Sequence, residues 1–180
     1  MHEIENFIKE RLSAKRFDHS KGVAECAEKL ADRYKVDRNS AFIAGLLHDC
    51  AKELPLEEMT KITEGLDLDG EVKESKNLLH GPAGAVLAKK HFDISDEIFD
   101  ACFYHTSGKE DMPLLTKIIF IADMIEQGRD FPGVEEIRNL AFEDIDRAIV
   151  LSIDSTLAHL TKKGAKIYPL TVKARNFLIK

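Results

Sequence analysis

The segment Ala41-Phe42-Ile43-Ala44-Gly45-Leu46-Leu47-His48-Asp49 decides the fold, because an apolar run ends there in a histidine and an aspartate. Asp37 stands just before it and is a good N-cap, so we expect a buried helix from Arg38 to Leu47. Polar groups at the end of a buried helix need partners, since an isolated buried charge is costly. A metal ion would be such a partner for His48 and Asp49.

Helical periodicity continues outward from this segment over the rest of the chain. Apolar residues recur every three or four positions from Ile4 to Leu12 and from Val23 to Tyr34. The other expected helices are one beginning near Leu56, Ala83 to His91 opened by Pro82, Asp96 to Tyr104 capped by Ser95, Leu114 to Ile125 opened by Pro113, Phe142 to Leu160, and Leu170 to Leu178 opened by Pro169. Strand patterns are weak. We therefore predict an all-α fold, one helical bundle of about eight to nine helices spanning residues 1–180.

The composition disfavours several classes of protein. Of 180 residues, 44% are hydrophobic and 32% are charged, which is typical of a globular domain and not of a disordered chain. The net charge of −6 argues against nucleic acid as a partner. No apolar run approaches the roughly 18 residues of a membrane helix, and the acidic N-terminus lacks the pattern of a signal peptide. Because no membrane helix is expected, we also expect no membrane association. The three cysteines lie far apart, so we expect no disulfide and a cytoplasmic location.

Further metal-ligand candidates lie beside apolar helical segments elsewhere in the chain. They are His19, His80, His105 and Asp123. Together with His48 and Asp49 they make four histidines and two aspartates, enough for two metal ions, with the two oxygens of Asp49 as a bridge. Imidazole and carboxylate ligands suit Fe, Zn, Mn or Ni. Taken singly, a histidine on an apolar helix is more often an ordinary core residue, and His2, His91 and His159 are assigned no metal role.

The order His19, His48-Asp49, Asp123 in a helical chain resembles the HD-domain phosphohydrolase superfamily, and His80 and His105 resemble its branch with two metal ions. Local strings across residues 15–171 resemble the YqeK-like family of symmetrical dinucleoside tetraphosphatases more closely still. These strings are Lys15-Arg16-Phe17-Asp18-His19-Ser20, His48-Asp49-Cys50-Ala51-Lys52, His80-Gly81-Pro82-Ala83-Gly84-Ala85, His105-Thr106-Ser107-Gly108, Ile121-Ala122-Asp123, Gly128-Arg129-Asp130-Phe131-Pro132-Gly133-Val134 and Tyr168-Pro169-Leu170-Thr171. Leu170 departs from the family, in which aspartate is common at this position.

This resemblance implies hydrolysis of diadenosine tetraphosphate into two ADP, with two transition-metal ions. Iron is the metal it implies, with Mn, Zn or Ni as alternatives. It implies that one ion is held by His19, His48, Asp49 and Asp123, and the other by Asp49, His80 and His105. The catalytic candidates are Asp49, Lys52 and Asp123. The substrate-binding candidates are His19, Lys52, His80, His105, Arg129, Tyr168 and Thr171.

Two of these cations also have a physical reason to lie near phosphate. Lys52 follows Asp49 by three residues, which places both on the same side of a helical turn. Arg129 lies in a glycine-rich turn after Asp123, and an arginine fork suits bidentate phosphate binding. A solvated lysine and a surface arginine are the alternative interpretations.

Other features suggest supporting roles. Asp18 and Glu53 adjoin candidate site residues and are candidates for carboxylates that orient a ligand. After Asp154 the sequence has six basic and no acidic residues, which suits either a solvated helix end or contact with an anionic ligand. The apolar segment Ala148 to Leu160 could support a homodimer.

Two other functions remain open from the sequence. One is an HD phosphohydrolase that acts on nucleoside monophosphates or on hyperphosphorylated guanine nucleotides. The other is a non-catalytic module that senses a nucleotide or a metal. A missing ligand would favour the module, and all six are present.

Overall fold

The computed structural model of the protein describes residues 2–179, and over this range the chain forms helices and no strand. The all-α prediction is thereby confirmed. The helices are α1 (His2–Lys9), α2 (Ala14–Tyr34), α3 (Arg38–Leu47), α4 (Leu56–Ile62), α5 (Gly70–Glu74), α6 (Lys76–His91), α7 (Asp96–Tyr104), α8 (Leu114–Ile125), α9 (Val134–Ala141), α10 (Ile145–Lys162) and α11 (Pro169–Leu178). Eleven helices form within the described range instead of eight to nine, because α5 and α9 are too short for the periodicity that reveals longer helices.

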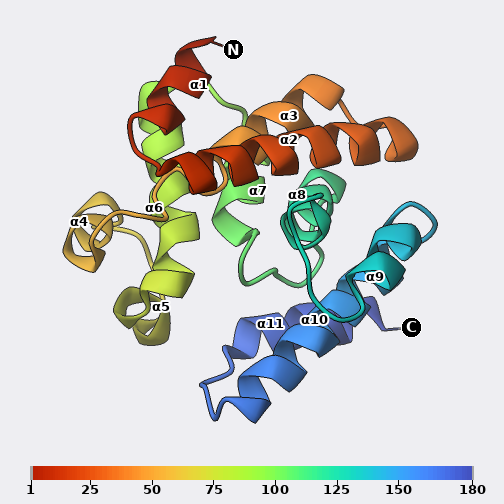
Figure 1. Ribbon diagram of the computed structural model, residues 1–180. Helices are drawn as coiled ribbons and strands as arrows, with labels where there is room; N and C mark the ends of the chain where they lie inside the picture. Colours follow the sequence, from red (N-terminus) through yellow and green to blue (C-terminus); the bar gives the residue numbers. More distant parts are fainter. Residues whose placement is uncertain (1, 180) are drawn as a thin grey trace.

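Helices α2 and α3 lie side by side, with α6, α7 and α8 beneath them (Figure 1). Gly45 sets how closely the upper two approach. A Cβ atom at Gly45 would lie 2.5 Å from the Cα of Ala24, so only glycine permits this contact. The side chains of Asp37 and Ser95 cap α3 and α7 by accepting backbone hydrogen bonds, and both helices have the predicted bounds.

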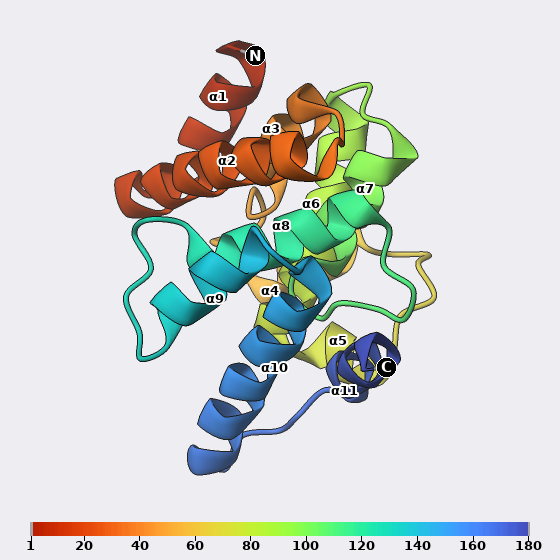
Figure 2. The same cartoon turned by 90° about the vertical axis from the view of Figure 1, so that its right-hand side faces the viewer.

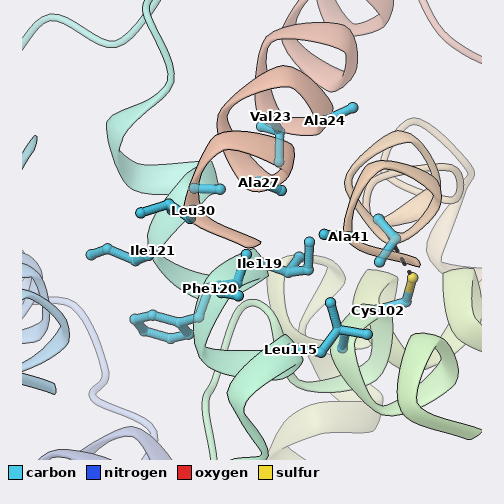
Figure 3. Packing of buried hydrophobic residues seen from close by; sticks show 14 of the residues in the cluster. Val23, Ala24, Ala27, Leu30, Ala41, Cys102, Leu115, Ile119, Phe120 and Ile121 are labelled. Atoms are coloured by element: carbon cyan, nitrogen blue, oxygen red, sulfur yellow. Dashed lines mark hydrogen bonds between the residues drawn. The ribbon is translucent and has the colours of Figure 1, made fainter. Parts of the chain in front are cut away.

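The main core fills the space between α2, α3, α7 and α8 (Figure 3). Its buried side chains include Val23, Ala27 and Leu30 of α2, Ala41 of α3, Cys102 of α7, and Leu115, Ile119 and Ile121 of α8. Burying each large aliphatic side chain stabilises the fold by about 1.5–3 kcal/mol. This packing therefore fixes the helices that carry the candidate site residues relative to one another.

Helix α6 differs from the prediction, because it does not begin after Pro82. The carbonyl of Ser75 accepts two amide hydrogen bonds that start the helix earlier, and Pro82 lies inside it. Proline costs the helix one donor, but the turns on either side remain. Gly81 lets α6 approach α7, since a Cβ there would lie 2.8 Å from the carbonyl oxygen of Phe103. His80 consequently lies within a helix and not in a loop.

Helices α9 and α10 pack on α8 and on each other, α11 packs on α10, and α10 projects away from the other helices (Figure 2). Helix α10 begins at Ile145, not at Phe142 as predicted. The reason is that Asp144 is its N-cap and accepts a hydrogen bond from the amide of Arg147 at 3.1 Å. No helix within residues 2–179 has the length and apolar character needed to cross a membrane.

Candidate metal centre

Four histidines and two aspartates meet where five helices converge, and they are the six residues that the sequence singles out. In chain order they are His19 (α2), His48 and Asp49 (end of α3), His80 (α6), His105 (end of α7) and Asp123 (α8). The four at the middle, His48, Asp49, His80 and His105, are each 3% exposed or less. The ligand atoms form three overlapping triads, and within each triad they lie within 4.8 Å of one another.

Asp49 lies at the middle of this group, and its two carboxylate oxygens face different histidines. Oδ1 lies 3.1 Å from Nε2 of His80 and 3.5 Å from Nε2 of His105. Oδ2 lies 3.5 Å from Nε2 of His48 and 3.8 Å from Nε2 of His19. The carboxylate thus divides the centre into two sides, each with two imidazoles.

Asp123 belongs to the side of His19 and His48. Its Oδ1 lies 3.0 Å from Nε2 of His19 and 3.9 Å from Nε2 of His48. Arg129 donates hydrogen bonds to the carbonyl oxygen of Asp123, at 2.7 Å, and to its carboxylate. Burial opposes ionisation of Asp123, but the close contact with His19 and the charges of His48 and Arg129 outweigh it, so its pKa lies far below the ordinary value.

Two of the imidazoles are oriented by backbone carbonyls that accept hydrogen bonds from their Nδ1 atoms. Nδ1 of His48 donates to the carbonyl oxygen of Gly45 at 2.7 Å, and Nδ1 of His105 donates to that of Cys102 at 2.7 Å. A carbonyl oxygen can only accept, so the proton of a neutral ring is on Nδ1. The Nε2 lone pairs are therefore directed into the centre, as metal ligation by histidine requires.

The free nitrogens of this centre fit a metal ion. Among residues 2–179, Nε2 of His19 and Nε2 of His48 are buried and make no hydrogen bond. Buried polar atoms without partners are uncommon and call for an explanation such as a bound ion. Imidazole with carboxylate is a donor set for Fe, Zn, Mn or Ni, and a soft thiolate site is excluded here.

Neighbouring groups keep Asp49 ionised, and burial keeps His80 neutral. Burial opposes ionisation of Asp49, but the charge of His48 and the close contacts with His105 and His80 outweigh it, so its pKa lies well below the ordinary value. Burial, together with the charges of His105 and Lys52, lowers the pKa of His80 to about 4. A neutral imidazole beside a carboxylate is the protonation state that binds a metal.

Lys52 lies against His80, as its position three residues after Asp49 suggests. Its Nζ is 3.5 Å from Nδ1 and 3.4 Å from Nε2 of His80. Burial lowers the pKa of Lys52 from its ordinary value, although the charges of Asp49 and Asp123 oppose this.

The carboxylate that orients His19 is Glu126, which the sequence reasoning missed. Oε1 of Glu126 accepts a hydrogen bond from Nδ1 of His19 at 3.1 Å. The two candidates named for such a role are wrong, because Glu53 accepts its hydrogen bonds from Ser13 and Asp18 is exposed. A usable pattern existed, since Glu126 ends the same apolar helix one turn after the candidate aspartate.

Arg16 also contacts the centre without having been predicted. Its Nη1 donates to Oδ2 of Asp49 at 2.9 Å. Arg16 precedes His19 by three residues on α2, so the two share one helix face, and this spacing could have identified it.

An open cavity of about 760 Å³ borders the side of His19. Its basic lining residues are Lys15, Arg16 and Arg129, and its lining also includes Glu126 and Asp130. Arg129 therefore lines the cavity and also donates a hydrogen bond to the carboxylate of Asp123 in the centre.

Tyr168 and Thr171 do not line this cavity. Tyr168 lies in a second cavity of about 190 Å³, with Tyr104 and Ser107, and its hydroxyl donates to the carboxylate of Asp69 at 2.7 Å. Tyr104 and Ser107 are close to His105 in the chain, but none of the six residues of the centre lines this cavity. Thr171 lies in the first turn of α11, where its amide donates to the carbonyl of Tyr168.

The three cysteines are free. Cys50, next to Asp49, points its sulfur toward the carbonyl of Gly84 at 3.4 Å, and burial raises its pKa to about 12. A thiol with so high a pKa is a poor nucleophile and a poor metal ligand. Cys102 likewise donates to the carbonyl of Ala44 in the core.

This arrangement of a histidine-aspartate pair at a helix end with ligands from separate helices is matched by a known family. Residues 16–128 match the family model described as the HD domain, and this range contains all six residues of the centre. The chain belongs to the HD-domain family.

Within that family the similarity is more specific. The chain is 40% identical to the symmetrical bis(5'-nucleosyl)-tetraphosphatase of Bacillus subtilis (strain 168), over 96% of this chain and 94% of the relative. It is also 40% identical to the protein of the same name from Halalkalibacterium halodurans, over 96% of this chain and 93% of the relative. The crystal structure of an HD superfamily hydrolase from Clostridium acetobutylicum, described as involved in NAD metabolism, has a TM-score of 0.95 and 43% identity, over 98% of this chain and 95% of that one. The family predicted from the sequence strings is confirmed.

Proposed function

We propose that this protein hydrolyses diadenosine tetraphosphate symmetrically into two ADP. The observation that carries the proposal is the group of four histidines and two aspartates, four of them buried, beside a cavity with three basic side chains. The 40% identity to relatives named as symmetrical bis(5'-nucleosyl)-tetraphosphatases supports the choice of substrate. Hydrolysis of a phosphoanhydride needs an activated water and positive charge near the phosphates, and a site of this composition can supply both.

The six residues hold two metal ions in this proposal. One set is His19, His48, Asp49 and Asp123, and the other is Asp49, His80 and His105. The division of the centre by the two oxygens of Asp49 supports this assignment. Iron is the metal we propose, with Mn, Zn or Ni as alternatives that suit the same ligands. When bound, such ions acidify water and offset the charge of the phosphates.

The remaining roles fall to side chains of this protein. Lys52 places an ammonium group beside His80, where it offsets the charge of a phosphate oxygen near the reacting bond. Arg129 borders the cavity and offers N–H groups of its fork to a second phosphate. Glu126 holds the ring of His19 in place through Nδ1.

The proposal also covers nucleoside binding, the cellular location and the oligomeric state. Tyr168 offers an aromatic face in the smaller cavity for one nucleoside, and Thr171 in the adjoining turn supports it. The reaction takes place in the cytoplasm, where free cysteines are stable. A homodimer formed through α10 stays a prediction, which analytical ultracentrifugation would test.

A chromatographic assay of products tests this function. The protein is purified without oxygen, loaded with iron, and incubated with diadenosine tetraphosphate, with a nucleoside monophosphate and with a hyperphosphorylated guanine nucleotide. We expect ADP alone from the first and no turnover of the others. AMP with ATP, or release of inorganic phosphate from the monophosphate, would contradict the proposal, and no turnover of any substrate would favour a sensing module.

Matched histidine variants control for nonspecific effects. His80→Ala should abolish turnover because it removes a ligand. His159→Ala, which replaces an exposed histidine of α10, should leave turnover unchanged.

A further inference from the structure

Arg16 contacts the centre from the wall of the large cavity, and it is not one of the six metal-ligand candidates. Its Nη1 donates to Oδ2 of Asp49 at 2.9 Å, while 30% of its side chain is exposed. It shares one face of α2 with His19. One guanidinium group therefore touches the middle of the centre and borders open space.

The contact with Asp49 competes with the proposed role of Asp49. Oδ2 also faces His19 and His48, so in the proposed function this oxygen ligates a metal ion. A metal ion on the same oxygen takes up its lone pairs and repels the guanidinium. Loss of a proton cannot relieve this repulsion, because the guanidinium of arginine stays charged in proteins. Arg16 then needs a different anion.

The carboxylates of the cavity wall are poor partners for Arg16. Glu53 and Glu126 already accept hydrogen bonds from other groups. Asp18 and Asp130 are exposed, and water weakens ion pairs at exposed positions. The anion that fits is therefore one that enters the cavity from outside.

A polyphosphate chain has the matching chemistry. Lys15, Arg16 and Arg129 bring three cations to one cavity, and the planar fork of arginine binds two phosphate oxygens at once. Arg16 lies at the carboxylate of Asp49 and Arg129 at that of Asp123, so both guanidinium groups lie next to the centre. We propose that Arg16 is a substrate-binding residue, whose guanidinium leaves Asp49 and binds the polyphosphate beside the bond that is cleaved. This inference rests on the proposed function of the same centre.

Three variants of the metal-loaded full chain test it. Arg16→Gln removes the charge, Arg16→Lys keeps the charge without the fork, and Lys29→Gln is a control on an exposed lysine of the same helix, outside this cavity. ADP is the probe, with its affinity measured by isothermal titration calorimetry. We expect Arg16→Gln to bind ADP roughly 10- to 100-fold more weakly and to raise KM for diadenosine tetraphosphate by a similar factor. Arg16→Lys should recover part of the affinity, and Lys29→Gln should stay within about threefold of the wild type.

Metal content after gel filtration separates phosphate binding from a role in shaping Asp49. It should stay at the wild-type level in Arg16→Gln. The inference is overturned if Arg16→Gln binds ADP with wild-type affinity, or if its metal content and its ADP affinity both fall by a similar factor. Should Arg16→Gln fail to fold, Arg16→Lys carries the test, and wild-type ADP affinity in it would overturn the role of the fork. ADP binding is measured without turnover, so the two proposals can fail separately. If the wild type binds ADP through Arg16 but does not cleave the tetraphosphate, the proposed function is contradicted and the role of Arg16 in binding is not.

Discussion

Replacing Gly45 by alanine should destabilise the protein and disturb the metal centre. The added Cβ would lie 2.5 Å from the Cα of Ala24 and 2.8 Å from its amide nitrogen, and both are backbone atoms. Non-bonded carbon atoms rest about 3.5–4.0 Å apart, so α2 and α3 must separate by about 1 Å. Helix α2 carries His19, whose Nε2 lies only 3.0 Å from Oδ1 of Asp123, so the separation acts on the centre.

Two opposing contributions set the magnitude of this effect. Overpacking costs about 1–3 kcal/mol, and more where backbone must move, whereas alanine gains about 0.5–1 kcal/mol over glycine inside a helix. Because the clash is with backbone, we expect a net loss of about 2 kcal/mol in the free energy of unfolding. For a chain of 180 residues, 1 kcal/mol corresponds to about 2–4 °C, so Tm should fall by about 4–8 °C.

Gly84→Ala is the matched control, also inside a helix and next to the centre. A Cβ there would lie 3.4 Å from the carbonyl oxygen of His48 and 3.5 Å from the sulfur of Cys50, which leaves room for it. Its Tm should be unchanged or higher by up to about 4 °C. The assay is thermal unfolding of the metal-free variants by circular dichroism, with metal binding measured separately. Equal Tm values for Gly45→Ala and Gly84→Ala would show that Gly45 does not set the spacing of α2 and α3.

Four further predictions concern the centre itself. Asp49→Ala should lose both metal ions after gel filtration, and retained stoichiometry would count against the bridge. Glu126→Ala should weaken metal binding by about 10- to 100-fold, with partial recovery in Glu126→Gln, while equal affinity in all three proteins would dismiss its orienting role. Cys50→Ala should keep most activity, and a hundredfold loss would show that the thiol takes part. In the metal-free protein, burial lowers the pKa of His80 to about 4, so the unfolded chain binds the proton first as the pH falls. The free energy of unfolding should therefore be greatest above about pH 6.5 and decrease between about pH 6.5 and pH 4. His80→Gln should reduce this decrease in denaturant titrations, and an unchanged pH profile would contradict the prediction.

Local signals in the sequence were enough for much of the fold. The caps Asp37 and Ser95 gave the bounds of α3 and α7, because an N-cap acts through atoms a few residues away. Pro82 misled the prediction for α6, since a proline inside a helix is tolerated where packing holds the turns on both sides. The short helices α5 and α9 are stabilised by contacts with α6, α8 and α10, which no local pattern reveals.

The six residues of the centre could be found because their chemistry is unusual where they stand. An aspartate inside the apolar run of α8 has no structural purpose, so it marks a site. Glu126 and Arg16 were missed because ordinary surface-type residues gain their roles from partners 107 and 33 positions away. Long-range contacts of this kind appear only once the helices are packed.

Anomalous diffraction from crystals of the metal-loaded protein, recorded at the iron absorption edge, tests whether the six residues hold two metal ions. We expect two peaks about 3.5–4 Å apart. One peak should lie among His19, His48 and Asp123, and the other beside His80 and His105, with Asp49 between them. A single peak, or peaks away from Asp49, would contradict it.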